Sequence, residues 1–259
     1  MNYKQEDIEI KGSPVRFITI QTNEQNSFTK ENLLEFEALV ENCKNDQNVK
    51  ALVITSENEK FFSNGVDAQN IINTPAERLA DEMGQIVKFF NYLITFDKPL
   101  ISEISGYAMG GGGVVALACD YRYMLEGKAR LSFTEVFFGL PLPGTFIEKI
   151  KLTVKPEYIN DFIYGSAFKA HEAKAAGFIH ETASDRASLR NLVNKKLDQL
   201  LRIPSSAFRH TKQTLNHDIR ASTERHMKSL AENFANPVIM SNLLEAMKSL
   251  QENRRPRFQ

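Results

Sequence analysis

Apolar and polar positions along the first part of the chain predict a hairpin followed by a helix. Two β-forming segments, 8–10 and 15–22, flank the turn sequence Gly12-Ser13-Pro14, which indicates a hairpin. After Thr29, a residue suited to cap a helix, apolar side chains recur at helical spacing, at Leu33, Phe36, Leu39, Val40 and Cys43. Strands and helices therefore alternate from the start of the chain.

The rest of the pattern continues this alternation and then becomes helical. The expected elements are buried strands at 49–54 and 100–105, a loop at 61–66, helices at about 76–95 and at 114–119, and strands at 121–125 and 129–133. From about residue 140 helices dominate, with helical patterns at 189–201, 207–215 and 238–250. We expect strand-strand-helix units in an α/β core over residues 1–200, followed by a helical region over residues 201–259.

Composition narrows the class of protein. Of the 259 residues, 42% are hydrophobic and 25% are charged, as in ordinary globular domains. The 32 basic and 32 acidic side chains balance, so charge gives no reason to expect nucleic acid or an anionic membrane as partner. Two cysteines, a polar N-terminus and the absence of a long apolar span predict a cytoplasmic protein without membrane segments.

The stretch GYAMGGGGVVALACD, residues 106–120, places four glycines before a helical apolar run. Each glycine in a helix costs about 0.5–1 kcal/mol relative to alanine. A phosphate loop is disfavoured because no Gly-Lys-Ser/Thr ending follows. Close packing of the helix is one explanation. The other is an oxyanion hole, in which bare backbone N–H groups at a helix N-terminus stabilise a substrate oxygen. Spacing alone leaves both open, with residues 61–67 (FFSNGVD) as candidate second donor loop.

Several motifs together resemble the crotonase, or enoyl-CoA hydratase/isomerase, superfamily. They follow the family's order from about residue 8 to 250 and comprise Asn26-Ser27-Phe28, FFSNGVD at 61–67, Lys98-Pro99, GYAMGGG at 106–112, Cys119-Asp120, SFTEVFFGL at 132–140, Pro143-Gly144 and AKAAGFI at 173–179. The resemblance implies an α/β crotonase-like spiral of strand-strand-helix repeats. It also implies a homotrimer, or a hexamer, with the C-terminal region 201–259 at the subunit contacts.

The resemblance also assigns roles by position. The N–H groups of Val66 and Gly111 would form the oxyanion hole that holds the thioester oxygen of an acyl-CoA substrate. Coenzyme A would be part of the substrate, and no separate cofactor or metal is implied. The remaining residues expected at the substrate are Asn64, Gly65, Asp67, Ala68, Gly110, Gly112, Val114 and Phe138, of which Asp67 would cap or anchor the first oxyanion loop.

Glu135 is the expected catalytic group. Family hydratases use two acid/base residues, and here the first position is Val114, which cannot move a proton. A single glutamate beside an apolar residue is similar to the mitochondrial-type 3,2-enoyl-CoA isomerases, in which one carboxylate moves a proton from the α to the γ carbon. An apolar surrounding would raise the pKa of the glutamate. Without the resemblance, a carboxylate in an ordinary helix-capping context is the simpler interpretation of Thr134-Glu135.

Two alternatives stay open at this point. One is enoyl-CoA hydration or another crotonase activity on CoA or carrier-protein thioesters. The other is a non-catalytic thioester- or RNA-binding member of the fold. Elsewhere in the chain, Glu148 is expected to form a solvated pair with Lys151. The five histidines lack metal-binding spacing and are expected at the surface or at helix ends. The Phe-Phe pairs are expected in the core, with Phe137 or Phe138 lining an acyl pocket.

Overall fold

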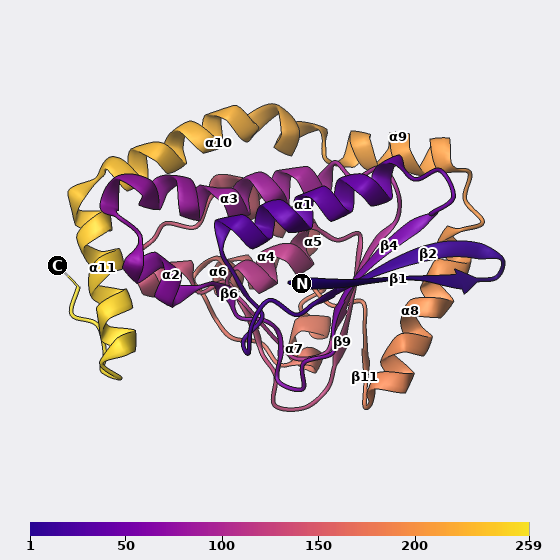
Figure 1. Ribbon diagram of the computed structural model, residues 1–259, viewed down its shortest axis with the longest axis horizontal. Helices are drawn as coiled ribbons and strands as arrows, with labels where there is room; N and C mark the ends of the chain where they lie inside the picture. Colours follow the sequence, from indigo (N-terminus) through magenta and orange to yellow (C-terminus); the bar gives the residue numbers. More distant parts are fainter. Residues whose placement is uncertain (259) are drawn as a thin grey trace.

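The computed structural model describes residues 1–258 and confirms the predicted α/β class (Figure 1). Its largest sheet has the strand order β1-β2-β4-β7-β9-β11, with bounds Tyr3–Ile10, Ser13–Ile20, Ala51–Ser56, Leu100–Ile104, Tyr121–Leu125 and Glu181–Ala183. β1 and β2 form the predicted antiparallel hairpin, and the other neighbours in this sheet are parallel. A second sheet has the order β10-β8-β5, with bounds Leu131–Ser132, Tyr107–Met109 and Phe61–Ser63. A third pairs β3 (Ser27–Phe28) with β6 (Gly65–Val66).

Helices cover both faces of the large sheet. The helices of the described residues are α1 (Lys30–Asn45), α2 (Ala68–Asn73), α3 (Ala76–Ile94), α4 (Gly111–Ala118), α5 (Gly144–Thr153), α6 (Ile159–Ile163), α7 (Ala170–Ala175), α8 (Arg186–Leu200), α9 (Ser205–Leu215), α10 (His217–Ala235) and α11 (Pro237–Gln251), with the 3₁₀ turns η1 (Glu135–Phe138) and η2 (Pro156–Tyr158). Figure 1 shows α10 running along the layer of α1 and α3, while α8 lies on the other side of the sheet.

Strand β4 shows why its sequence is a continuous apolar run. Leu52 and Ile54 point into the main core, whereas Ala51 and Val53 belong to a second cluster packed by α8. Side chains alternate between the two faces of a strand, and here both faces are covered. All residues of β4 are therefore buried.

The structure confirms the predicted start and the predicted buried face of the first helix. The Thr29 hydroxyl accepts a hydrogen bond from the Asn32 N–H, and the Asn32 side chain accepts one from the Thr29 N–H. This reciprocal capping box fixes where α1 begins. Along α1 the predicted face is buried at Leu33, Phe36, Val40 and Cys43, with Leu39 partly buried against the same core.

Four short or polar elements have no specific counterpart among the elements expected from the sequence. The predicted loop 61–66 contains β5 and β6, which pair with β8 and β3. Strand β11 lies where helices were expected to dominate, and α10 lies in the expected helical region 201–259 although no separate helix was predicted over its residues. Each owes its existence to contacts with segments distant in the sequence. Local propensity therefore carries little information about them.

The C-terminal helices pack on their own chain. α10 contacts α3 and α5, and α11 contacts α2 and η1. The predicted Glu148–Lys151 pair is wrong, because Glu148 of α5 instead contacts three side chains of α10. Its carboxylate accepts from Ser222 Oγ at 2.7 Å and lies 2.9 Å from His226 Nε2 and 3.2 Å from an Arg225 nitrogen. The neighbouring helix offers these partners, and a surface ion pair contributes too little to compete.

None of the helices described in residues 1–258 combines the length and apolarity that crossing a bilayer requires.

Candidate active site

The glycine run forms the N-terminal turn of α4 and makes close backbone contacts there. The first intrahelical bond runs from the Val114 N–H to the Gly110 carbonyl at 3.0 Å. The N–H groups of the first helical residues, beginning with Gly111, therefore have no acceptor inside the helix. A Cβ on Gly112 would lie 2.3 Å from the Ser63 carbonyl oxygen, so only glycine fits there. Close packing explains Gly112, while Gly110 and Gly111 line a cavity.

The two predicted donor segments lie against each other. Gly65 has φ +83°, and a Cβ there would lie 2.7 Å from the Gly111 nitrogen. The Asp67 N–H donates to the Phe28 carbonyl of β3 at 2.8 Å. The Asn64 N–H donates to the Gln25 carbonyl at 3.0 Å, so the segment that carries Val66 is held at both ends by β3 and the loop before it. Val66 and Gly111 also line the same cavity. This arrangement is compatible with the predicted pair of oxyanion donors.

Asp67 holds the start of α2 in place. Its Oδ1 accepts from the Asn70 N–H at 2.8 Å as an N-cap, and its Oδ2 accepts from Asn23 Nδ2 at 3.0 Å. The side chain thus ties the end of β6 to the loop before β3. A position of this kind fits the anchoring role that the sequence suggested.

Glu135 is the first residue of η1 and places a carboxylate at the glycine turn. Its Oε2 is buried without a hydrogen-bond partner among the described residues. Its Oε1 lies 3.8 Å from the point that a Cβ on Gly110 would occupy. Burial raises the pKa of Glu135 to about 7. Thr134 makes no capping bond to η1, so the helix-capping interpretation does not account for this pair.

Two adjoining cavities open beside Glu135. The larger has a volume of about 280 Å³ and is lined by Asn64, Val66, Ala68, Met83, Met109, Gly110, Gly111, Thr134, Glu135, Phe138, Leu140, Met247 and Leu250. The smaller, of about 40 Å³, shares Val66, Met83, Glu135 and Leu140 with it and is otherwise lined by Ile86, Val87, Pro141, Pro143, Phe146, Leu230, Asn233 and Phe234. Glu135 is the one titratable side chain among the described residues that line either cavity.

Some predicted substrate residues lie outside these linings. Gly65, Asp67 and Gly112 support the walls from behind, as described above. Val114 is fully buried in the main core. Of the phenylalanine pair, Phe138 lines the larger cavity, whereas the side chain of Phe137 is 57% exposed, which corrects its expected place in the core.

Helices far along the chain supply walls that the sequence analysis missed. Met83 comes from α3, Leu230 and Phe234 from α10, and Met247 and Leu250 from α11. Each of these residues belongs to an amphipathic helix, and an apolar face of this kind indicates that the helix packs against another part of the protein. The sequence does not indicate that these apolar faces line a cavity.

The comparison with protein-family models decides the family. The model for enoyl-CoA hydratase/isomerase matches residues 11–259, nearly the whole chain. The chain belongs to the enoyl-CoA hydratase/isomerase family. The resemblance seen in the motifs is thereby confirmed at the family level.

Relatives within the enoyl-CoA hydratase/isomerase family include both activities. The chain is 26% identical over 235 residues to the crotonyl-CoA hydratase of Syntrophomonas wolfei, covering 90% of this chain and 89% of that protein. It is also 26% identical over 200 residues to the mitochondrial enoyl-CoA delta isomerase 1 of Mus musculus, covering 76% and 68%. Among solved structures, human mitochondrial delta3-delta2-enoyl-CoA isomerase superposes with a TM-score of 0.88 at 19% identity, covering 98% and 99%. That likeness shows the shared fold.

Proposed function

We propose that this enoyl-CoA hydratase/isomerase family member shifts the double bond of a 3-enoyl-CoA to give a 2-enoyl-CoA. The observation that supports it most is the single buried carboxylate of Glu135 at cavities with no other titratable lining. One carboxylate suffices for an isomerisation because the same group serves first as base and then as acid. Adding water across the double bond is usually shared between two such groups in this family.

The mechanism follows from the arrangement of the turn and the carboxylate. Glu135 takes a proton from the α carbon, and the electron pair of that C–H bond delocalises onto the thioester oxygen. The N–H groups of Val66 and Gly111 stabilise this oxyanion. Glu135 then returns the proton to the γ carbon, which leaves the double bond between the α and β carbons. The apolar walls, including Leu140 and Phe138, exclude water that would intercept the dienolate.

The direct test offers the purified protein a 3-enoyl-CoA and, separately, a 2-enoyl-CoA. We expect the 3-enoyl substrate to gain the ultraviolet absorbance of a conjugated thioester at unchanged mass. The 2-enoyl substrate should not gain the mass of one water. A product heavier by one water would instead identify a hydratase, and reaction of neither substrate would overturn the proposal.

The pH profile provides a second test. As a general base, Glu135 acts only when deprotonated, and burial raises its pKa to about 7. We therefore expect kcat/KM to fall about tenfold per pH unit below pH 7 and to level off above it. A glutamate with an ordinary pKa would keep the rate flat down to about pH 5. Initial rates between pH 5 and pH 9 distinguish the two profiles.

The hydratase alternative is favoured by the similarity to crotonyl-CoA hydratase. Its test is Val114→Glu, which restores a carboxylate at the family's other acid/base position. Because Val114 is fully buried, we expect the variant to lose stability and isomerase activity without gaining hydration. Val114→Gln is the matched control, since it adds a similar volume without charge. Strong hydration by the glutamate variant alone would show that the site is otherwise built for water addition.

The proposal also includes where the enzyme acts and how its subunits assemble. Acyl-CoA brings the coenzyme as part of the substrate, and a cytoplasmic location suits the two buried free thiols. A trimer or hexamer with region 201–259 at its contacts is supported by large apolar side chains exposed there on α11, Val238 and Leu244. Sedimentation equilibrium should give three or six times the 29.4 kDa chain mass, and a monomer at micromolar concentration would contradict this.

A further inference from the structure

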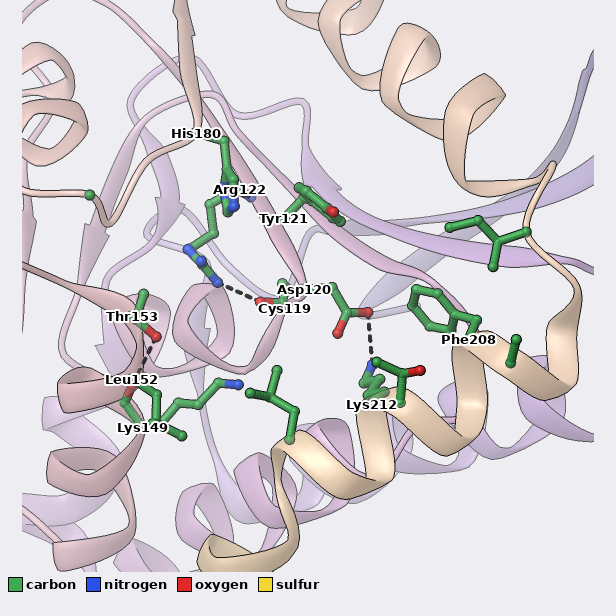
Figure 2. Close-up of a pocket in the computed structure, with 15 residues that line it drawn as sticks. Cys119, Asp120, Tyr121, Arg122, Lys149, Leu152, Thr153, His180, Phe208 and Lys212 are labelled. Carbon is green, nitrogen blue, oxygen red and sulfur yellow. Dashed lines mark hydrogen bonds and ion pairs between the residues drawn. The ribbon is translucent and has the colours of Figure 1, made fainter.

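Figure 2 shows the lining of a separate cavity of about 460 Å³. This cavity lies beside Cys119, the C-cap of α4, whereas Glu135 lies beside Gly110 at the other end of that helix. It is bounded by the residues that follow α4, by the start of β9, and by α5 and α9. It shares no lining residue with the two cavities beside Glu135. The proposed isomerisation makes no use of it.

Buried positive charge outweighs negative charge in this cavity. Arg122, Lys149 and Lys212 line it and are all buried, whereas Asp120 is the one carboxylate among the described residues that line it. Lys212 Nζ pairs with Asp120 Oδ2 at 2.8 Å. Three cations against one carboxylate leave an excess of two positive charges. His180 adds none at pH 7, because partial desolvation of its ring and the nearby Arg122 guanidinium lower its pKa to about 4.

The buried positive charge of Arg122 is stabilised by neutral backbone carbonyl groups. Its guanidinium donates to the carbonyl oxygens of Phe178 and Cys119. Cys119 is the C-cap of α4, where the helix dipole places partial negative charge. The carbonyl acceptors therefore explain how this buried cation is tolerated.

The buried positive charge of Lys149 is not stabilised by a comparable set of carbonyl groups. Its Nζ donates one hydrogen bond, to Asn216 Oδ1 at 2.9 Å, and has no ion-pair partner among residues 1–258. Figure 2 shows its side chain extending from α5 toward α9, where Lys212 points to Asp120. Burial, with the charges of Arg122 and Lys212, lowers the pKa of Lys149 to about 8. Two hydrogens of a buried ammonium group are thus left for an acceptor.

We infer that this cavity binds the phosphate group of a small phosphate ester, with Lys149 as the principal ligand. A phosphate monoester carries about −1.5 to −2 charges at pH 7, which matches the excess of two positive charges. The cavity is larger than a phosphate ion needs, and its rim is apolar at Leu152, Ile203 and Phe208. The rim therefore suits an organic group attached to the phosphate.

Calorimetric titration of the full-length protein with inorganic phosphate and with phenyl phosphate, at matched ionic strength, tests this site. We expect saturable binding of phenyl phosphate that weakens at least about tenfold in Lys149→Met. Lys151→Met is the matched control, because it removes the same charge from an exposed position of the same helix. Lys149→Arg keeps the charge and should retain binding. Tighter binding of phenyl phosphate than of inorganic phosphate assigns the organic ester, and equal affinities assign the free ion and overturn the role of the rim.

Thermal unfolding gives an independent readout. Phenyl phosphate at 100 times its Kd for the native chain should raise the Tm of that chain by about 5 °C, and the same concentration should raise the Tm of Lys149→Met by no more than about half as much. The methionine variant should fold, because replacing an uncompensated buried charge by an apolar side chain is seldom destabilising. No saturable binding by the native chain, or equal binding by Lys149→Met, would overturn the proposal.

Discussion

Glu135→Gln is expected to lower the isomerisation rate of a 3-enoyl-CoA by about 10²- to 10⁴-fold. Glutamine keeps the size and polarity of the side chain but cannot accept a proton from the α carbon. No other titratable side chain among the described residues lines the two cavities, so none can replace it there. Glu157→Gln is the control, since it makes the same change at an exposed residue. Full turnover by Glu135→Gln would remove Glu135 from the mechanism.

The same substitution should stabilise the fold at neutral and alkaline pH. Burial raises the folded-state pKa of Glu135 to about 7, above that of an unfolded glutamate, so the charged form is disfavoured in the fold. This destabilisation is absent below the unfolded pKa, grows as pH rises, and is complete above pH 7. At pH 8 we expect Glu135→Gln to be more stable by about 3 kcal/mol, and at pH 4 the difference should vanish. Urea unfolding at the two pH values measures it and separates lost activity from lost folding.

Gly65→Ala is expected to lower kcat by about 10²- to 10³-fold, the effect of losing one oxyanion donor. The new Cβ would lie 2.7 Å from both the Gly111 nitrogen and the Met109 carbonyl oxygen. Relief of this clash must separate the turn that carries Gly111 from the segment that carries Val66. The left-handed backbone at φ +83° adds about 1–2 kcal/mol of strain.

Gly12→Ala separates the two effects of that substitution. Gly12 has nearly the same φ, +80°, but a Cβ there meets no atom within 4 Å. We expect it to lose a similar amount of stability from backbone strain while keeping kcat unchanged. Steady-state kinetics with thermal unfolding of both variants makes the comparison. Equal kcat values in the two variants would show that the contact between Gly65 and Gly111 does not shape the site.

The sequence alone determined the elements whose causes are local. The hairpin follows from a turn sequence between β-formers, and the start of α1 follows from Thr29. Strand β4 follows from an apolar run that only a doubly covered sheet can bury. The order of several motifs was enough to indicate the family, which the family model confirms. The same motifs predicted that Glu135 and the glycine turn belong to the active site.

Only the tertiary structure decided how these parts meet. Pairing of β5 with β8 brings residues 61–67 against the glycine turn. The sequence of residues 61–66 carries no strand pattern, and it was therefore predicted to be a loop. The helical character of region 201–259 was expected, but not that α10 closes the smaller cavity with Leu230 and Phe234. The raised pKa of Glu135 and the uncompensated charge of Lys149 are likewise properties of their surroundings. Burial and pairing depend on residues far away along the chain, so no local pattern could have specified them.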